Sequence, residues 1–425
     1  MLDIKLIRDN PELVKEKLKL RGEDDKVIHR IQKIDSDRLE ILHKLEKLKE
    51  LRNKASDEIA VMKKNKLDAS TAINQTRLLG DEIKELDSQI KNLETELEKE
   101  LYYIPALPDE SVPIGKNETE NVEVKVWGEK KSLTFKPKDH IELGKSLDIL
   151  DFDRGTKIAG SGFPLYKGKG ATLERALINF MLDTHISKNG YNEVITPVLA
   201  NRASMEAAEK VPKFEDDMYY IQRDDLFAIP TAEVSILNIH RDEILKEEEL
   251  PMRYSGFTNC FRREAGSYGK DTKGFLRVHQ FNKVELINFC KPEDSYNELE
   301  KMLSDATRLL EDLNIHYRVI ELCTGDLGFA ASKCYDIEVW SYAEDKWLEA
   351  SSVSNCTDFQ SRRAKVRFKR HGGDGKQKTE LVHILNGSGL ATSRLMVALL
   401  ESYQTEDGHI VVPEVLKKYT NFERI

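Results

Sequence analysis

The chain has 425 residues, of which 33% are charged and 40% hydrophobic, and its formal net charge is −9. This length allows two or three domains and a large buried core, and the negative charge alone argues weakly against nucleic-acid binding. The N-terminal segment is charged, which argues against a secretory signal, and the five cysteines are scattered without a C-x-x-C pair, which argues against a disulfide framework. No apolar run approaches the roughly 18–20 residues of a membrane helix. A cytoplasmic location is therefore expected.

A seven-residue hydrophobic repeat runs through the first hundred residues in two stretches. The first stretch extends from Val27 to Met62, and the second extends from Leu79 to Leu97. Apolar residues sustained at both repeat positions over this length are typical of a coiled coil. The sequence therefore predicts two long helices at the start of the chain.

These helices, at about 27–101, are expected to form an antiparallel hairpin, because the polar segment 62–71 suits a turn at its tip. At about 1.5 Å per residue, a helix of about 36 residues would project about 50 Å. Residues 26–79 contain 13 Lys or Arg against 8 Asp or Glu. A basic rod can lie along a phosphate backbone, although a spacer or a dimerisation element would show the same repeat.

Three prolines, Pro105, Pro108 and Pro113, end any helix after the arm. They mark the expected boundary between an arm domain, residues 1–105, and a second domain, residues 106–425. The second domain mixes helices and short strands without regular β-α-β alternation, which favours an α+β fold with an antiparallel sheet flanked by helices. Helices are expected at 171–190, with Gly190 as a C-cap, and at 295–312, and strands at 191–200, 254–261, 275–289, 335–341 and 347–354.

The segment FRREAGSYGKDTKGFLRVHQF, residues 261–281, carries charges where a buried strand would be apolar. Because side chains alternate along a strand, Arg262 and Glu264 would share one face and Arg263 would point away. Arginine can hold a phosphate with two hydrogen bonds, a phenylalanine face can stack on a purine, and a carboxylate can accept from an amine. This pattern predicts a pocket for a flat, anionic ligand, although surface ion pairs would give it too. A strand over 277–285 would place Arg277, His279, Phe281, Lys283 and Glu285 on one face.

Two further segments carry polar groups that suit a ligand site. In KWLEASSVSNC, residues 346–356, Glu349 stands among small hydroxyl residues, and a carboxylate with hydroxyl and phosphate oxygens is a typical magnesium environment. In LNGSGLATSRLMVALLE, Asn386 and a flexible glycine pair are expected before a helix that carries Arg394 on its early turns. Ordinary loops and turns can show both patterns.

The sequence contains no nucleotide-binding loop of a familiar type. No G-x-x-x-x-G-K-[ST] segment occurs, and HGGDGKQK, residues 371–378, has its glycines and lysine at the wrong spacing, so a surface loop is expected there. A nucleotide would have to be held by side chains. The residues by themselves indicate an ATP-using enzyme with a basic helical arm and leave its substrate open.

In this order, the segments resemble the bacterial-type seryl-tRNA synthetases, which are class II aminoacyl-tRNA synthetases. The resemblance covers essentially the whole chain. It implies that motif 1, at about 171–200, builds a dimer interface, and it places motif 2 at about 254–287 and motif 3 at about 385–401. The segments that carry it are MLDIKLIRDNPELVKEKLKLRG with the arm, LERALINFMLDTH, P-T-A-E at 230–233, FRREAGSYGKDTKGFLRVHQFNKVE, LEASSVSNCTDFQSRR and LNGSGLATSR.

The resemblance implies ATP-dependent activation of L-serine to seryl-adenylate and transfer of the seryl group to the 3′ end of tRNA(Ser), and to that of tRNA(Sec) in a host that has it. Arg262 would hold the α-phosphate, Glu264 the adenine amine and Arg394 the γ-phosphate, while Phe281 would stack on adenine. Arg262, Glu349 and Arg394 are the expected catalytic residues. The ATP-binding set would be Arg262, Arg263, Glu264, Arg277, Val278, Phe281, Glu349, Ala350, Ser351, Ser352 and Arg394.

The same resemblance implies sites for serine, magnesium and RNA. Glu349 and Ser352 would hold Mg²⁺, and no structural zinc is expected. The loop between Ala265 and Gly274 would reach the acceptor end of tRNA, and the arm would grip the long variable arm by shape and backbone across a homodimer. The serine-binding set would be Thr231, Ala232, Glu233, Arg262, Glu285, Asn386 and Ser388, with Glu285 on the ammonium and the last two near the hydroxyl.

Three alternatives compete with this interpretation. A threonyl enzyme would need a zinc site of Cys and His ligands, and the sequence has no suitable cluster. A synthetase-like ligase that loads a carrier protein would lack the long arm. A non-catalytic coiled-coil RNA-binding or scaffold protein would have no need of Arg262, Glu349 and Arg394 together.

Overall fold

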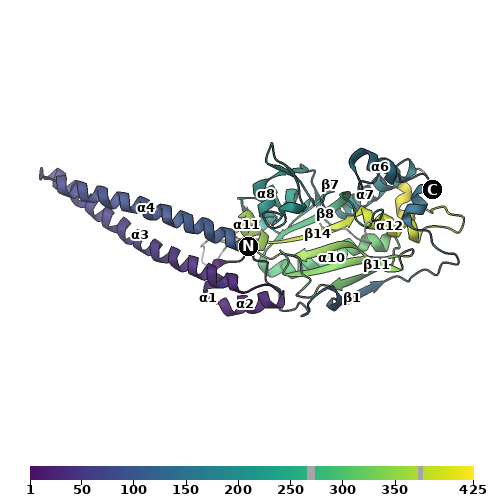
Figure 1. Cartoon of the computed structure of the whole chain (residues 1–425), viewed down its shortest axis with the longest axis horizontal. Coiled ribbons are helices and arrows are strands. Elements are labelled where there is room, and N and C mark those ends of the chain that lie inside the picture. The colour runs from purple at the N-terminus through teal and green to yellow at the C-terminus, as the bar shows by residue number, and fades with distance from the viewer. Residues whose placement is uncertain (266–272, 372–376) are drawn as a thin grey trace. The chain divides into compact units, whose positions relative to one another are not determined.

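The computed structural model describes residues 1–265, 273–371 and 377–425, and the chain divides into two compact units, Met1–Pro105 and Ala106–Ile425 (Figure 1). Long helices form the first unit and a mixed sheet forms most of the second, as the α+β prediction expected. No described helix combines the length and apolar character needed to cross a membrane. The first unit contains α1 (Ile4–Asp9), α2 (Pro11–Leu20), α3 (Lys26–Lys64) and α4 (Ser70–Leu101).

The short helix α1 packs against both α2 and α3. The Asp3 side chain accepts a hydrogen bond from the backbone N–H of Lys5 and so caps α1, and proline occupies the first turn of α2, where its missing N–H costs nothing. Arg8 pairs with Asp35 of α3 at 2.8 Å. The apolar side chains buried in this unit near the start of α3 include Ile7, Val14, Leu18, Ile28 and Ile31.

α3 and α4 form the predicted antiparallel hairpin. Leu45 of α3 packs with Ile83 and Ile90 of α4, and the two helices are paired across the seam by Lys49 and Asp87 at 3.1 Å. Arg38 and Arg52 interrupt the apolar repeat. The Arg38 guanidinium pairs with Asp35 at 2.8 Å and lies 3.8 Å from Glu94. The apolar seam therefore continues through one charged layer.

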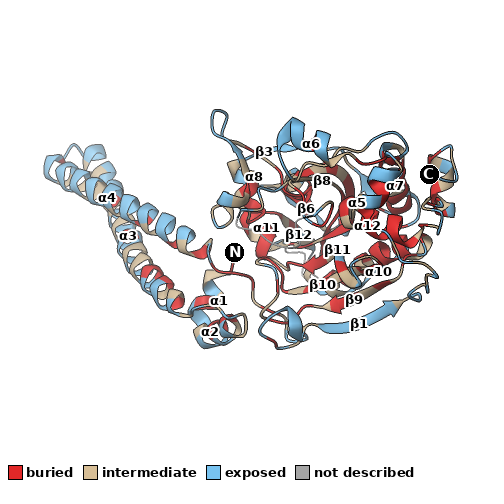
Figure 2. Ribbon diagram, turned by 45° about the vertical axis from the view of Figure 1, so that its right-hand side comes forward, coloured by how far each residue is buried: buried red, intermediate tan, exposed pale blue. Residues whose placement is uncertain are grey.

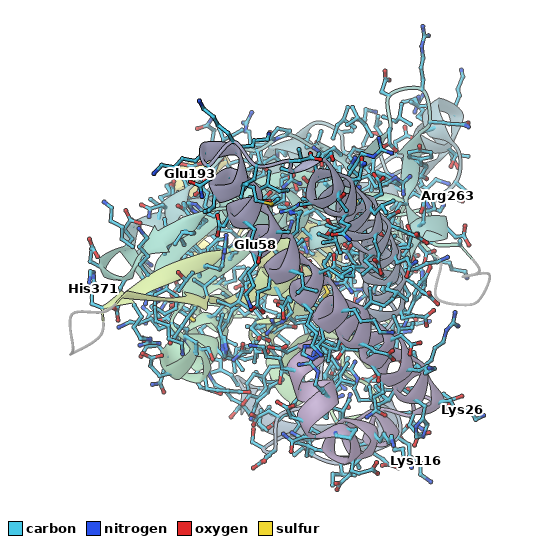
Figure 3. The ribbon with its side chains drawn as sticks, turned by 90° about the vertical axis from the view of Figure 1, so that its left-hand side faces the viewer. Lys26, Glu58, Lys116, Glu193, Arg263 and His371 are labelled. Carbon is cyan, nitrogen blue, oxygen red and sulfur yellow. The ribbon has the colours of Figure 1, made fainter. Side chains whose placement is uncertain are left out.

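The half of the arm near the tip is more exposed. Glu58, in this half of α3, and Lys26, at the start of α3, are both exposed and are labelled in Figure 3. Five large apolar side chains in the tip half are more than a third exposed: Leu51, Val61, Leu67, Ile73 and Leu78. A helix surface that is both apolar and lysine-rich suits contact with another molecule.

The second unit is built on an eight-stranded sheet in the order β1-β9-β10-β11-β14-β8-β7-β2. All neighbouring strands are antiparallel except β2 and β7. The strands are β1 (Val122–Trp127), β2 (Asn192–Glu193), β7 (Met252–Phe261), β8 (Gln280–Cys290), β9 (Tyr317–Glu321), β10 (Lys333–Ser341), β11 (Lys346–Asn355) and β14 (His383–Ala391).

The described part of this unit also contains two small sheets and eight α-helices. The small sheets are β3 (Leu199–Asn201), β5 (Leu226–Ala228) and β4 (Tyr219–Ile221), and β13 (Gln377–Leu381), β12 (Arg367–His371) and β6 (Ile244–Lys246). The helices are α5 (His140–Ser146), α6 (Phe152–Ala159), α7 (Lys169–Ser187), α8 (Arg202–Ala207), α9 (Glu233–Leu237), α10 (Ser295–Asp312), α11 (Phe359–Ala364) and α12 (Thr392–Ser402).

Helices α7, α10 and α12 pack against the large sheet, and the main core lies between them and the strands (Figure 2). Val284 and Leu286 of β8 belong to this core. Their neighbours Lys283 and Glu285 point to the other face, because successive side chains alternate along a strand. Polar groups of β8 are thereby directed away from the helices.

Two predicted strands have different bounds. β8 begins at Gln280 rather than at 275, so Arg277 and His279 precede the strand and do not share its face by strand alternation. The predicted strand at 191–200 is broken into β2 and β3 with an irregular stretch between them. Pro197 lies in that stretch and lacks the N–H that a ladder needs.

The prediction that Gly387 and Gly389 form a flexible pair is wrong, because both lie inside β14. A Cβ on Gly387 would stand 3.0 Å from the Met302 sulfur, and a Cβ on Gly389 would stand 2.6 Å from Nε2 of His185. These glycines therefore allow α10 and α7 to approach the strand closely, which is a packing role rather than a turn.

Candidate active site

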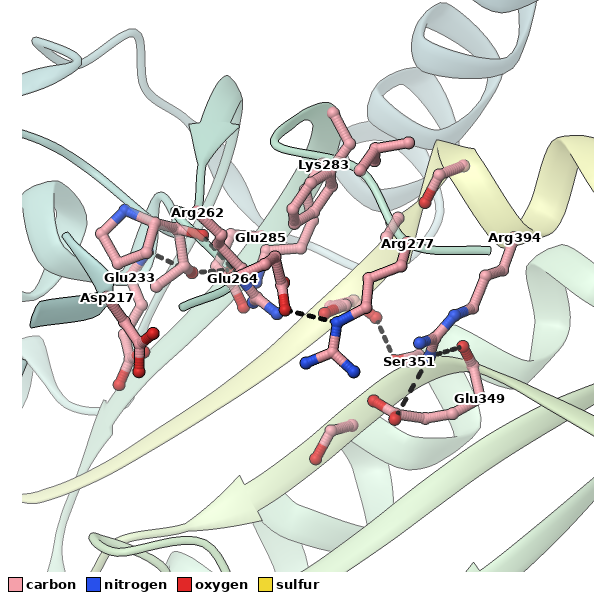
Figure 4. A pocket seen from close by; sticks show the side chains of 18 of the residues that line it. Asp217, Glu233, Arg262, Glu264, Arg277, Lys283, Glu285, Glu349, Ser351 and Arg394 are labelled. Atoms are coloured by element: carbon pink, nitrogen blue, oxygen red, sulfur yellow. Dashed lines mark hydrogen bonds and ion pairs between the residues drawn. The ribbon is translucent and has the colours of Figure 1, made fainter. Parts of the chain in front are cut away.

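A cavity of about 660 Å³ opens on the sheet face opposite the core helices, at the ends of β7, β8, β11 and β14 and the start of α12 (Figure 4). Arg394 and Glu349 lie at one end of the view, and Glu233 lies at the other. Predicted site residues that line the cavity are Thr231, Glu233, Arg262, Glu264, Arg277, Val278, Phe281, Glu285, Glu349, Ala350, Ser351, Ser352, Asn386, Ser388 and Arg394.

Two predicted residues do not line the cavity. Arg263 turns away, and its guanidinium donates to the backbone oxygen of Asp216 at 2.8 Å. Ala232 is fully buried at the start of α9 and packs in a core cluster. Most of the loop between Ala265 and Gly274 lies outside the described residues, as does most of the predicted surface loop at 371–378.

Arginine and an aromatic ring come together beside β8. The guanidinium of Arg262 lies 5.1 Å from the centre of the Phe281 ring, and its Nε donates to the backbone oxygen of Pro230 at 3.4 Å. Glu264 pairs with Arg277 at 2.5 Å and has a φ of +49°, a left-handed conformation that is uncommon for a residue with a Cβ. That turn brings Glu264 into the cavity although it lies beyond the end of β7.

The second arginine is held by the neighbouring hairpin. Arg394 Nη1 donates to the backbone oxygen of Glu349 at 2.7 Å and lies 3.3 Å from its carboxylate. Ser351 donates its hydroxyl hydrogen to the backbone oxygen of Ser388 at 2.7 Å, so β11 and β14 are joined beneath the site. The start of α12, which carries Arg394, is thus fixed against β11.

Buried carboxylates dominate the opposite end. Glu285 pairs with Lys283 at 2.5 Å and accepts a hydrogen bond from the Thr231 hydroxyl at 2.6 Å. Burial raises the pKa of Glu285, and the positive charge of Lys283 opposes that shift. Glu233 is buried on the same side of the cavity. Both carboxylates can therefore face a small cationic or hydroxyl-bearing ligand, whereas Arg394 at the far end can face an anion (Figure 4).

Comparisons with known proteins identify this arrangement. Residues 1–108 match the seryl-tRNA synthetase N-terminal domain, and residues 213–403 match the tRNA synthetase class II core domain (G, H, P, S and T). The chain is 54% identical over the whole of both sequences to a serine–tRNA ligase of Chloroherpeton thalassium. It belongs to the seryl-tRNA synthetase family.

Other members of the family agree over the same length. A serine–tRNA ligase of Geobacillus kaustophilus is 53% identical over 99% of this chain and 98% of that protein. The seryl-tRNA synthetase of Pyrococcus horikoshii, solved in complex with ATP, superposes with a TM-score of 0.92 at 40% identity, covering 100% of this chain and 99% of that one. The full-length match includes both the arm and the cavity.

The magnesium prediction for this seryl-tRNA synthetase family member can be tested against the donors on β10 and β11. Ser352 lies opposite Asp336 in the strand pair, a residue that the sequence analysis missed. Burial and the nearby charge of Glu349 raise the pKa of Asp336 well above its usual range. Two carboxylates that repel each other beside a hydroxyl suit a divalent cation, so Glu349 and Ser352 fit the ion.

These protein groups do not form a complete metal centre by themselves. Among the described residues, no three His, Cys, Asp or Glu side chains come together in a way that could hold a metal ion. Mg²⁺ usually binds through one or two carboxylates and completes its octahedron with water and substrate phosphates. The donor set therefore fits an ion that binds together with a nucleotide.

Glu174 is a second residue that the sequence analysis missed. Its carboxylate, buried on α7, accepts hydrogen bonds from the Asn282 amide at 2.7 Å and from the Thr392 hydroxyl at 2.5 Å. Asn282 lies between two cavity residues of β8, and Thr392 lies two residues before Arg394. One buried carboxylate thus connects α7, β8 and α12.

Glu174 should make the stability of the chain depend on pH. Burial raises its pKa to about 7, although the Thr392 and Asn282 hydrogen bonds oppose the shift. The folded state therefore holds a proton that the unfolded state releases near pH 4.5, so stability falls as pH rises from about 4.5 to 7. In urea unfolding, the free energy of unfolding of the Glu174→Gln chain should rise by about 2 kcal/mol relative to that of the parent chain as the pH rises from 5 to 8. If the difference in unfolding free energy between the two chains were the same at pH 5 and pH 8, Glu174 would be ionised over that whole range.

Proposed function

We propose that the chain activates L-serine with ATP to form seryl-adenylate and transfers the seryl group to the 3′ end of tRNA(Ser). One observation carries the proposal: a single cavity holds Arg394 and Glu349 at one end and the buried carboxylates Glu233 and Glu285 at the other, with Arg262 beside these carboxylates (Figure 4). This distribution of charge suits a triphosphate and an amino acid side by side. The serine–tRNA ligases among the relatives and the relative solved with ATP support it.

Each end of the cavity has a proposed occupant. Arg262 holds the α-phosphate, which its planar guanidinium can bind through two hydrogen bonds, and Arg394 holds the γ-phosphate. Glu264 accepts a hydrogen bond from the adenine amine, and Phe281 stacks on the adenine ring. The Phe281 ring already has the flat guanidinium of Arg262 against it, so it can take part in stacking. The remaining proposed ATP contacts are Arg277, Val278, Glu349, Ala350, Ser351 and Ser352, whereas Arg263 is left out because its side chain turns away from the cavity.

The amino acid occupies the carboxylate end. Glu285 receives the serine ammonium, Thr231 and Glu233 complete the wall, and Asn386 and Ser388 face the hydroxyl. Arg262 also reaches the serine carboxylate. Arg262 thus stands where the two substrates meet, which makes it the central positioning group of the reaction.

Two displacements follow from this placement. An oxygen of the serine carboxylate attacks the α-phosphorus in line, the bond to the bridging oxygen breaks, and pyrophosphate leaves. A hydroxyl of the terminal ribose of tRNA then attacks the seryl carbonyl, and AMP leaves. Little acid–base chemistry is required, so positioning and charge neutralisation by Arg262 and Arg394 supply most of the rate. Mg²⁺, held by Glu349 and Ser352 when bound, neutralises phosphate charge.

The arm is the proposed site of tRNA recognition. Lys63, Lys64 and Lys66 are exposed at its tip, and apolar side chains near them are exposed as well. Lysines release counterions when they neutralise phosphates, and RNA helices are recognised largely by shape and backbone. The proposed partner is the long variable arm of tRNA(Ser), and of tRNA(Sec) in a host that has it. A cytoplasmic location follows from this role in supplying charged tRNA.

We also propose a homodimer that binds tRNA across its two subunits. Motif 1 carries apolar side chains that the isolated chain leaves open, with Ile195 at 91% exposure and Val198 and Leu199 more than a third exposed. An apolar stretch of this kind on an irregular segment suits a subunit interface.

Amino-acid-dependent ATP–pyrophosphate exchange tests the proposed activity. With Mg²⁺ and folded protein, exchange should require serine and should stay at background with threonine, glycine, alanine or no amino acid. Exchange with a different amino acid would reassign the substrate. No exchange with any of them would contradict an adenylation site and would favour an RNA-binding scaffold.

A further inference from the structure

A half-buried lysine faces the carboxylate end of the cavity. Lys210 Nζ lies 3.0 Å from the Glu233 carboxylate and 3.4 Å from the Glu209 carboxylate, and the Lys210 side chain is 19% exposed. Lys210 lines the cavity, and nothing in the sequence EKVPKF distinguishes it from a surface lysine. Its contacts exist only because α8 and α9 lie together.

The backbone before Lys210 is held in an unusual conformation. α8 ends at Ala207, the N–H of Lys210 donates to the oxygen of Met205 at 2.9 Å, and Glu209 has a φ of +49°. This is the Schellman ending of a helix, in which the left-handed position usually carries glycine. A buried glutamate there costs conformational free energy, and the turn directs Lys210 toward Glu233.

Glu233 is surrounded by donors from three other segments. Besides Lys210, the Gln360 amide donates to it at 2.6 Å and the Asn386 amide donates to it at 3.2 Å. Gln360 also donates to Glu209 at 3.0 Å, so one amide joins both carboxylates. Both oxygens of Glu233 are therefore held in place before any ligand arrives.

The balance of charge around Glu233 depends on Lys210. Burial raises the pKa of Glu233, but the Lys210 charge and hydrogen bond outweigh burial and hold that pKa below its ordinary value. Burial lowers the pKa of Lys210, and the charges of Glu233 and Glu209 more than reverse it. Further charges from Lys283, Glu285 and Arg363 act on this cluster. Without Lys210, Glu233 would face two carboxylates.

We infer that Lys210 is a positioning residue for the amino acid: it keeps Glu233 ionised and correctly oriented, so that Glu233 presents only acceptors to serine. This inference rests on the proposed function, since it concerns the serine end of the same cavity. Lys210 touches neither reacting atom and acts through Glu233. Arg394 and Glu349 lie at the other end of the cavity from Glu233 (Figure 4).

The test is a comparison of Michaelis constants for serine and ATP in pyrophosphate exchange. Lys210→Met keeps the length of the side chain and removes its charge, so the KM for serine should rise at least tenfold while the KM for ATP stays within twofold. Lys188→Met is the matched control, because Lys188 also forms an ion pair, at 3.1 Å with Asp312, but lies outside the cavity. That variant should keep both constants.

A double variant separates positioning from general support of the fold. In a Glu233→Gln chain the carboxylate is gone, so adding Lys210→Met should change the serine KM less than threefold. The inference would be overturned if Lys210→Met raised the serine KM by the same factor in the Glu233→Gln chain as in the parent chain. It would also be overturned if Lys210→Met raised the KM for serine and the KM for ATP equally. If Lys210→Met does not fold, Lys210→Gln replaces it, and failure of both to fold would make Lys210 structural only. A parent chain without exchange would instead contradict the proposed function.

Discussion

Replacing Arg262 with alanine should slow serine-dependent pyrophosphate exchange by about 10²–10³-fold, which corresponds to about 3–4 kcal/mol of transition-state stabilisation. Negative charge develops on the α-phosphate during the attack, and a guanidinium fixed beside it stabilises that charge without reorganising. Arg262 is well placed for this role, because the Phe281 ring and the Pro230 backbone oxygen hold its guanidinium near the start of β8. Single-turnover formation of seryl-adenylate would measure the effect directly.

Two further variants define the origin of that effect. Arg262→Lys keeps the charge and removes the two-pronged geometry, so it should recover only part of the rate. Arg308→Ala removes an exposed arginine from α10, among the helices packed on the core face of the sheet, and should leave the exchange rate unchanged. A rate within tenfold of the parent for Arg262→Ala would contradict the proposed role of Arg262.

Shortening the arm should separate the two half-reactions completely. Replacing residues 52–80 with a short Gly-Ser linker keeps the Lys49–Asp87 pair and the packing of Leu45 on Ile83 and Ile90, so the base of the arm stays folded. The cavity belongs to the other unit, and serine-dependent exchange should therefore stay within twofold. Charging of tRNA should fall at least 100-fold, because the shortened arm no longer carries the lysines that we propose neutralise phosphates.

A charge variant tests whether the tip acts through phosphates. Changing Lys63, Lys64 and Lys66 to glutamine preserves the helices but removes three exposed charges. The affinity for tRNA should fall, and the dependence of its logarithm on the logarithm of salt concentration should flatten by about one unit for each lysine that had neutralised a phosphate. If the chain with the shortened arm charged tRNA as fast as the parent chain, the arm would be a structural spacer and not a tRNA-binding element.

Much of the fold was predictable because its signals are local. The heptad repeat predicted α3 and α4 closely, and the polar Arg38 within it forms an ion pair with Asp35. Strand positions were predicted well where apolar and polar residues alternate, as in β7 and β10. The predictions failed where packing decides: β8 starts late, the strand through Pro197 is broken, and the NGSG glycines lie in a strand.

The sequence by itself determined the helical arm, the α+β class and the motif segments that identify the family, because periodicity, prolines and short motifs act over neighbouring residues. Only the tertiary structure decided which polar groups meet. Gln360 reaches Glu233 across 127 residues, and Thr392 reaches Glu174 across 218. Strand order and helix packing set such contacts, so Lys210, Glu174 and Asp336 became visible only when the sheet had brought the segments together.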